Sequence, residues 1–231
     1  MSTNDFEQLK TGIGNISVIT EETISRIPKV KAFSDEDMND KLFEHHANLL
    51  RKAMNKNESN EVGLFWNLND VEAECLEIYG KINGFNMRDN EDVYKLVNDP
   101  ASFLSVIVMH NHPRNGLFSS VDLKTFADFD SIYMLTAVGN DGTIYMIRKE
   151  MNFNPFLLEK YYNEGAKTSV IKANEERMRK AKKMGLNIGN PIDAEKIKNI
   201  QTKPYYYGTK NVAKHAKEIG ITYRCSVKRV R

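Results

Sequence analysis

The residues best suited to chemistry in this chain fall within one short segment that ends at Asp122. His110 and His112 stand two positions apart at the end of an apolar, β-branched run, so in an extended strand both imidazoles project from the same face. Pro113 ends the strand, and Asn115-Gly116 permits a tight reversal that can bring Asp122 back towards the histidines. Two histidines and an aspartate are ligands that hold a catalytic zinc and leave a fourth position for water.

Ser119 and Asp122 also have a purely structural interpretation. Ser-x-x-Asp is the sequence of a capping box, in which the serine caps a helix and the acid reaches back to the backbone of the serine. Taken alone, the spacing favours the capping box. After a His-x-His pair, in a chain with only 5 histidines, the metal interpretation becomes the stronger one. Ser119 is able to cap the helix and act in the site at the same time.

The string His110-Asn111-His112-Pro113, followed by a short loop and Ser119-x-x-Asp122, resembles the JAMM (MPN+/JAB) metalloprotease family. Its opening is most similar to the RadC-like branch and to the JAB domains of phages and mobile elements. The resemblance covers about residues 58–150. It implies that His110, His112 and Asp122 bind Zn2+ and that Ser119 is the active-site serine.

The resemblance also implies an upstream glutamate that acts as general acid and base. Glu61 fits best because it directly precedes an apolar strand candidate, and its alternative role is that of a solvated acid at a strand edge. Other acids close by are Glu58, Glu72 and Glu74. The loop before Ser119 is one residue shorter than is usual for the family, which makes Ser120 a rival for the serine.

The implied activity is zinc-dependent hydrolysis of a peptide or isopeptide bond, with a protein or peptide substrate of which a ubiquitin-like protein is one class. A second hypothesis is a non-catalytic assembly component of a phage or mobile element. Such a component would bind nucleic acid or a protein partner through the basic residues 151–231. The string His-Asn-His also occurs in HNH nucleases, but no dispersed set of downstream metal ligands is present.

The segments around the motif must form the elements that position it. The run 103–109 has the composition of a buried strand, and residues 89–98 and 119–129 are typical of helices. Residues 132–138 and 143–147, joined by Gly139-Asn140-Asp141-Gly142, predict a hairpin. This is an α+β pattern centred on a mixed β-sheet flanked by helices. The family resemblance implies a cytidine-deaminase-like JAB/MPN fold.

The sequence predicts three parts: a helical leader (1–57), the JAB/MPN-like domain (58–150) and a basic, mostly helical C-terminal extension (151–231). In the leader, Ser34 is the expected cap of a helix, on which His45 and His46 are interpreted as surface residues. In the extension we expect helices over 155–184 and 210–218 and a final extended segment from Ile221.

Charge and composition limit the classes of protein further. Residues 1–150 hold 24 acidic and 15 basic side chains, a net charge of −9, whereas residues 151–231 hold 7 and 18, a net charge of +11. A basic segment favours an anionic partner, either nucleic acid or the acidic part of the chain. The polar start, the absence of a long apolar run and only two distant cysteines predict a cytoplasmic protein without a membrane span.

Overall fold

The computed structural model describes residues 17–81, 84–202 and 205–226. Contacts divide the described residues into two compact units. The sheet unit comprises residues 17–158 and 216–226, and the helical unit comprises residues 159–202 and 205–215.

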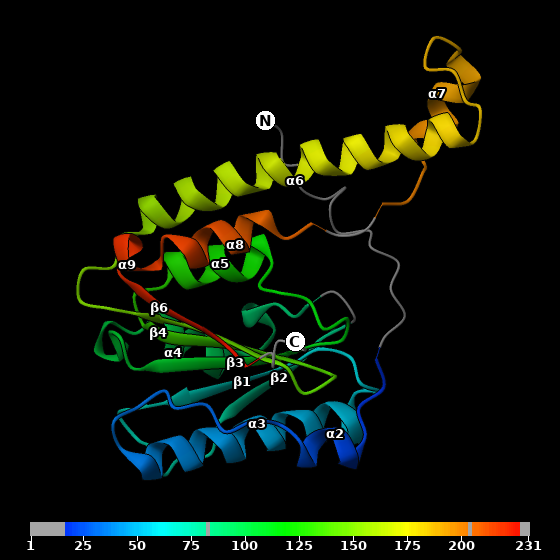
Figure 1. Cartoon of the computed structure of the whole chain (residues 1–231). Helices are drawn as coiled ribbons and strands as arrows, with labels where there is room; N and C mark the ends of the chain where they lie inside the picture. The colour runs from blue at the N-terminus through cyan, green and yellow to red at the C-terminus, as the bar shows by residue number, and fades with distance from the viewer. Residues whose placement is uncertain (1–16, 82–83, 203–204, 227–231) are drawn as a thin grey trace. The chain divides into compact units, whose positions relative to one another are not determined.

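The sheet unit is built on a six-stranded sheet with the strand order β2-β1-β3-β4-β5-β6 (Figure 1). Strands β3 and β4 are parallel, and every other neighbouring pair is antiparallel, which confirms a mixed sheet in an α+β architecture. The strands are β1 (Val62–Asn67), β2 (Leu76–Tyr79), β3 (Val106–His112), β4 (Ile132–Gly139), β5 (Ile144–Lys149) and β6 (Ile221–Cys225).

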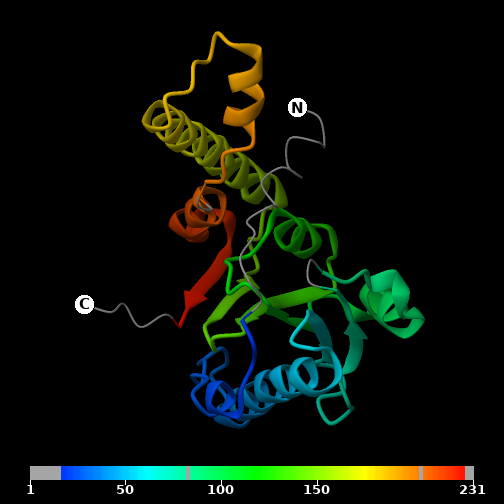
Figure 2. The same ribbon diagram turned by 90° about the vertical axis from the view of Figure 1, so that its right-hand side faces the viewer.

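Helices cover both faces of this sheet. Helices α2 and α3 lie on one face, and α5 lies on the opposite face (Figures 1 and 2). The helices of the sheet unit are α2 (Glu21–Ser25), α3 (Glu36–Lys56), α4 (Glu91–Asn98), α5 (Ser120–Asp128) and α9 (Ala216–Ile219), with 3-10 turns η2 (Met87–Asp89) and η3 (Pro100–Ser102).

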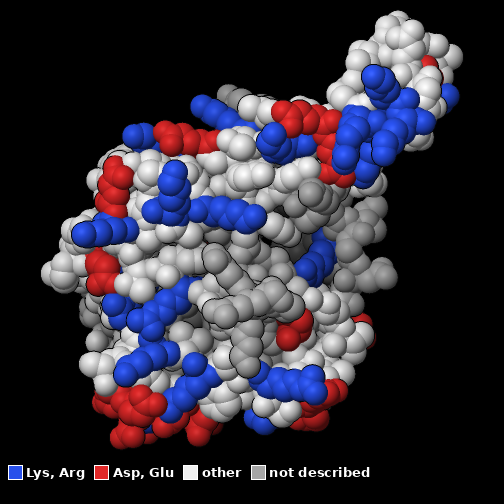
Figure 3. All heavy atoms as spheres, in the orientation of Figure 1, with Lys and Arg blue, Asp and Glu red and all other residues white. Residues whose placement is uncertain are grey.

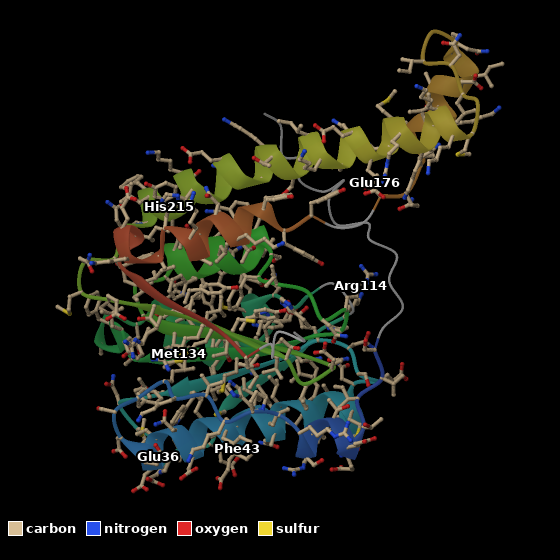
Figure 4. The ribbon with its side chains drawn as sticks, in the orientation of Figure 1. Glu36, Phe43, Arg114, Met134, Glu176 and His215 are labelled. Carbon is tan, nitrogen blue, oxygen red and sulfur yellow. The ribbon has the colours of Figure 1, made fainter. Side chains whose placement is uncertain are left out.

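The main core lies between α3 and the sheet. Leu42, Leu49 and Leu50 of α3 are buried with Trp66 of β1 and Met134 of β4, which is labelled in Figure 4. Because side chains alternate along a strand, the residues between these core positions face α5 instead. The candidate site residues of β3 belong to that second face.

Most expected elements are confirmed, with shifts at their ends. The helix over 89–98, the helix over 119–129 and the hairpin are present as α4, α5 and β4–β5. The cap of α3 is Asp35 rather than Ser34, because the Asp35 carboxylate accepts the Asp37 N–H at 2.9 Å. Strand β3 begins later than expected, since Leu104 adopts a left-handed backbone with φ of 48°.

The interpretation of His46 as a surface residue is wrong. Its side chain is fully buried between α3 and the sheet, and its Nε2 lies 3.0 Å from the Thr136 hydroxyl of β4. Two adjacent histidines on a helix point about 100° apart. His46 therefore faces the core, whereas His45 is only partly buried and packs on Trp66, with ring centroids 4.6 Å apart.

The helical unit contains most of α6 (Pro155–Lys183), together with α7 (Pro191–Lys198) and α8 (Tyr207–Lys214). Helix α8 packs closely on α6, because a Cβ at Gly165 would lie 2.2 Å from the Tyr207 carbonyl oxygen. The expected helix over 210–218 is divided at His215 into α8 and α9.

Within the described ranges, no helix is long and apolar enough to cross a membrane.

Candidate functional site

His110 and His112 stand at the end of β3, which has strands on both sides. His110 pairs with Gly63 of β1 and with Ala137 of β4, so its backbone is fixed from both directions. The imidazoles project from the same face, as expected, and their Nε2 atoms converge to 2.8 Å. Two ring nitrogens this close need a proton or a cation between them, because their lone pairs would otherwise repel.

The loop after β3 returns the chain to the histidines. The Asn115 N–H donates to the His112 carbonyl at 3.0 Å, and Asn115 takes a left-handed backbone with φ of 55°. The Nδ1 of His112 lies 2.7 Å from the Gly116 carbonyl oxygen. Since a carbonyl only accepts, this contact places a proton on Nδ1, so Nε2 is the ring nitrogen that faces the other two side chains.

Asp122 completes the group from the first turn of α5. Its Oδ1 lies 3.5 Å from the His110 Nε2, and its Oδ2 lies 3.4 Å from the His112 Nε2. One ligand atom from each of His110, His112 and Asp122 lies within 4.8 Å of the other two. The three side chains are 3%, 13% and 15% exposed, so a bound cation would be largely shielded from water.

Asp122 belongs both to the capping box of α5 and to the group that it forms with His110 and His112. The Asp122 N–H donates to the Ser119 hydroxyl at 3.2 Å, and the Ser119 N–H donates to the Asp122 Oδ2 at 2.5 Å. The two interpretations of Ser-x-x-Asp are therefore not alternatives, because the capping box holds the Asp122 carboxylate in the position that faces the histidines. Ser119 is exposed and, as an acceptor in this bond, keeps its own hydroxyl proton for another partner.

The charges in the group favour a bound cation. Burial alone would raise the pKa of Asp122, but the two histidines hold it well below its usual range. Burial likewise opposes protonation of His112, yet the hydrogen bond and charge of Asp122 outweigh it and raise the pKa of His112 to about 9. Both shifts come from the attraction between the Asp122 carboxylate and the histidines, so a negative charge is kept at the point where the three side chains meet.

Glu61 precedes β1 and belongs to the same face of the sheet. Gly63 pairs with His110, and two positions earlier Glu61 lies on the same side of the strand, towards His112. Glu61 is 9% exposed, and burial raises its pKa to about 7 against the opposing charges of His110 and His112. The competing acids Glu58, Glu72 and Glu74 are all exposed.

An aromatic side chain borders this face of the sheet. Phe85 lies over Gly63, where a Cβ would come within 2.5 Å of the Phe85 ring, and its ring meets the His110 ring edge-on at 6.3 Å between centroids. A Cβ added at Gly84, the residue before Phe85, would lie 3.9 Å from a carboxylate oxygen of Glu61. The segment around Phe85 thus contributes to the burial of Glu61. Sequence reasoning did not find this residue, which no motif marks.

Two buried asparagines near the site were also missed. Asn111, between the histidines, is fully buried, and Asn140 is 1% exposed in the β4–β5 turn. Their amides meet at 2.8 Å. The sequence signal for them is indirect: Asn140 belongs to the predicted turn, and Asn111 separates the two histidines of the motif.

His110, His112 and Asp122 form a group that can hold a metal ion, because their donor atoms converge and one of them carries a negative charge. Comparison of the chain with protein-family models, with curated proteins and with solved structures found no match.

Proposed function

We propose that this protein is a zinc-dependent hydrolase of peptide or isopeptide bonds, of the JAMM type and close to its RadC-like and mobile-element branch. The observation that carries the proposal is the convergence of His110, His112 and Asp122 on one point, with the buried Glu61 on the same face of the sheet. Two imidazoles and one carboxylate are a donor set that suits zinc and leaves a position for a further ligand.

Zinc held by these side chains would supply Lewis acidity, which polarises a carbonyl and lowers the pKa of water. Glu61 then has the role of general base and acid. Burial raises the pKa of Glu61, which suits a carboxyl group that takes a proton from the attacking water and returns it to the leaving amine. The exposed Ser119 hydroxyl has a proton to donate to the oxyanion that develops on the substrate carbonyl.

Zinc content is the first test. His112→Ala and Asp122→Ala should each abolish stoichiometric zinc in the purified protein, measured by mass spectrometry of the metal. His45→Ala serves as the matched control, since it removes a histidine outside the group and should leave the zinc content unchanged. Unaltered zinc in both site variants would exclude this site.

Hydrolysis is the second test, measured on a library of peptides and ubiquitin-like conjugates. Glu61→Gln should keep the bound zinc and lower the rate by about 100- to 10,000-fold, the usual contribution of a general base. Glu72→Gln, which changes an exposed acid, should have the activity of the wild type. Equal activity of the Glu61 and Glu72 variants would remove Glu61 from the mechanism.

A second candidate function, nucleic-acid binding by the helical unit, is supported by a basic surface. Lys and Arg side chains gather over the end of α6 and α7 (Figure 3). Lys172, Lys180 and Lys196 form ion pairs with acids of the same unit. Among residues 179–198, four exposed cations form no ion pair with any described residue: Arg179, Lys182, Lys183 and Lys198. Unpaired cations on one surface are the electrostatic signature of a polyanion site.

Binding of the full-length protein to a short DNA duplex at several salt concentrations tests this function. Changing the four unpaired cations to Gln should weaken binding at least tenfold and flatten the dependence on salt, because each lost phosphate contact reduces the slope by about one unit. Changing the three paired lysines to Gln is the control and should have a smaller effect. Equal effects of the two sets would indicate only a general response to net charge.

A further inference from the structure

We propose that Asn111 is a positioning residue that holds Glu61 in register with the metal ligands; this inference rests on the proposed function. Asn111 lies between His110 and His112 in the sequence, but alternation along β3 turns its side chain to the opposite face of the sheet. It therefore cannot join the ligand group, and its conformation must be explained by its contacts on that face.

The contacts of Asn111 are with the two residues that flank Glu61. Its Oδ1 accepts the Val62 N–H at 2.7 Å, and its Nδ2 donates to the Asn60 carbonyl at 3.1 Å. One side-chain amide thus binds the backbone on both sides of Glu61. The side chain is fully buried, so water cannot replace these hydrogen bonds without rearrangement.

The two hydrogen bonds that the Asn111 amide forms with Asn60 and Val62, here called the clamp, lie where the regular pairing of β1 with β3 ends. The last paired residues are Gly63 and His110. Beyond them the Asn111 amide takes the place of the next backbone rung on the β3 side, whereas on the β2 side the Glu61 N–H donates to the Lys81 carbonyl at 3.3 Å and the Glu61 carbonyl accepts the Gly80 N–H at 2.8 Å. A different side chain at position 111 would leave that segment without its hydrogen-bond partner in β3.

The segment before Glu61 needs such support. Glu58 and Ser59 both have left-handed backbones, with φ of 50° and 61°, which non-glycine residues adopt only at a cost. Asn140 secures this stretch, because its Nδ2 donates to the Ser59 carbonyl at 2.9 Å while its Oδ1 accepts from Asn111. The Asn140 N–H also donates to the His112 carbonyl at 3.2 Å. The two asparagines therefore connect the Glu61 segment with the ligand strand.

The chemistry of the clamp requires an amide. An aspartate at position 111 would still accept from the Val62 N–H, but it would turn an oxygen towards the Asn60 carbonyl and the Asn140 Oδ1, both of which are acceptors. Asn111→Asp consequently breaks two of the three hydrogen bonds without a change of size. It should release Glu61 while His110 and His112 stay in the ladder of β3.

Crystal structures of the zinc-loaded wild type and of Asn111→Asp test the proposal directly. We expect stoichiometric zinc and superimposable His110, His112 and Asp122 in both proteins, with the Glu61 carboxylate displaced in the variant. Asn115→Asp is the matched control, since it adds the same charge in the loop after β3, where the Asn115 amide contacts Ser17 and Asp141 instead. In that control Glu61 should keep its position.

Asn111→Ser, which also lacks the amide, provides the same comparison if the aspartate variant does not fold. An unmoved Glu61 in an Asn111 variant overturns the proposal, and so does a joint displacement of Glu61 and the ligands, which would indicate a merely structural role. These outcomes do not depend on hydrolysis, so an inactive wild type would contradict the proposed function and leave the positioning role to be judged from the structures.

A double-mutant cycle on the hydrolysed substrate adds a kinetic criterion. Asn111→Asp should lower kcat by about 100-fold, with little change of KM, as expected for a misplaced catalytic group. In a Glu61→Gln background the same substitution should have almost no further effect, because Asn111 acts through Glu61. Independent, multiplicative losses would show that Asn111 acts by another route.

Discussion

Asp122 takes part in two arrangements at once. Its carboxylate accepts the backbone N–H of Ser119 and also faces both histidines. The capping box therefore sets the orientation of the third side chain in the candidate metal group. The local bond with the Ser119 N–H, rather than the length of the preceding loop, fixes the final position of the carboxylate.

The first prediction at the residue scale concerns the serine. Ser119→Ala removes the cap acceptor of Asp122 and should destabilise the protein by about 1 kcal/mol. It should also weaken zinc binding, by less than about 10-fold, because the helical turn that carries Asp122 loosens while the Ser119 backbone N–H that holds the Asp122 carboxylate remains. Zinc competition titrations and urea unfolding measure the two effects. Ser120→Ala, one position later and without a cap bond, should change neither.

The second prediction concerns His46. Burial lowers its pKa from 6.5 to about 3, so the folded protein holds it neutral while the unfolded chain binds a proton below about pH 6.5. The stability that depends on neutral His46 is therefore complete above pH 6.5 and is lost as the pH falls towards 3. At about pH 5 the expected loss is about 2 kcal/mol.

Urea unfolding near pH 7.5 and near pH 5 measures this loss. His46→Gln, which cannot titrate, should lose about 2 kcal/mol less than the wild type between the two values. His45→Gln is the control, because its side chain is only partly buried and should account for less of the pH dependence. The same loss in wild type and His46→Gln would contradict the assignment.

At the scale of elements, the sheet owes its last strand to a tight turn after α9. Gly220 has φ of 76°, and a Cβ there would lie 2.4 Å from the Asn152 carbonyl oxygen. Both features require glycine. The turn allows β6 to pair with β5 from Lys149–Ile221 to Tyr145–Cys225. Gly220 thus permits the turn that places β6 beside β5.

The third prediction follows from this turn. Gly220→Ala should cost about 1–2 kcal/mol for the left-handed backbone and a further 1–3 kcal/mol for the overlap with Asn152. Gly142→Ala, at φ of 86° with its nearest neighbour at an ordinary 3.5 Å, should cost only the backbone part. Chemical unfolding of both variants measures the difference. Equal losses of unfolding free energy in the two variants would mean that the backbone at Asn152 shifts to admit the Cβ at no measurable cost.

At the scale of the whole molecule, the site and the basic surface belong to different units. His110, His112, Asp122 and Glu61 are in the sheet unit, and the unpaired cations are in the helical unit. The two candidate functions therefore rest on separate parts of the chain, and a failure of one does not remove the support for the other.

The fourth prediction concerns metal and stability. A cation that binds the folded site but not the unfolded chain should stabilise the protein by about 2.7 kcal/mol at a free concentration one hundred times its Kd. Zinc should accordingly raise the melting temperature of the wild type, and a chelator should reverse the shift. In His112→Ala neither addition should move the melting temperature, which calorimetry can establish.

The sequence by itself determined the local features of this protein. The His-x-His spacing, the helix that begins beside Asp122 and the turn at Gly139–Gly142 depend on neighbours a few residues apart, and all are present as expected. An α+β architecture with a mixed sheet also followed from the order of strands and helices. Such features can be predicted because alternation, capping and turn formation are properties of short segments.

Only the tertiary structure decided which distant residues meet. The amide of Asn111 binds the backbone beside Glu61, and His46 reaches Thr136, across 49 to 51 and 90 positions of sequence respectively. Nothing local distinguishes these polar side chains from surface residues. They are buried because the pairing of β1 with β3 and the packing of α3 on the sheet enclose them, and a buried polar group must then find its partner wherever the fold provides one.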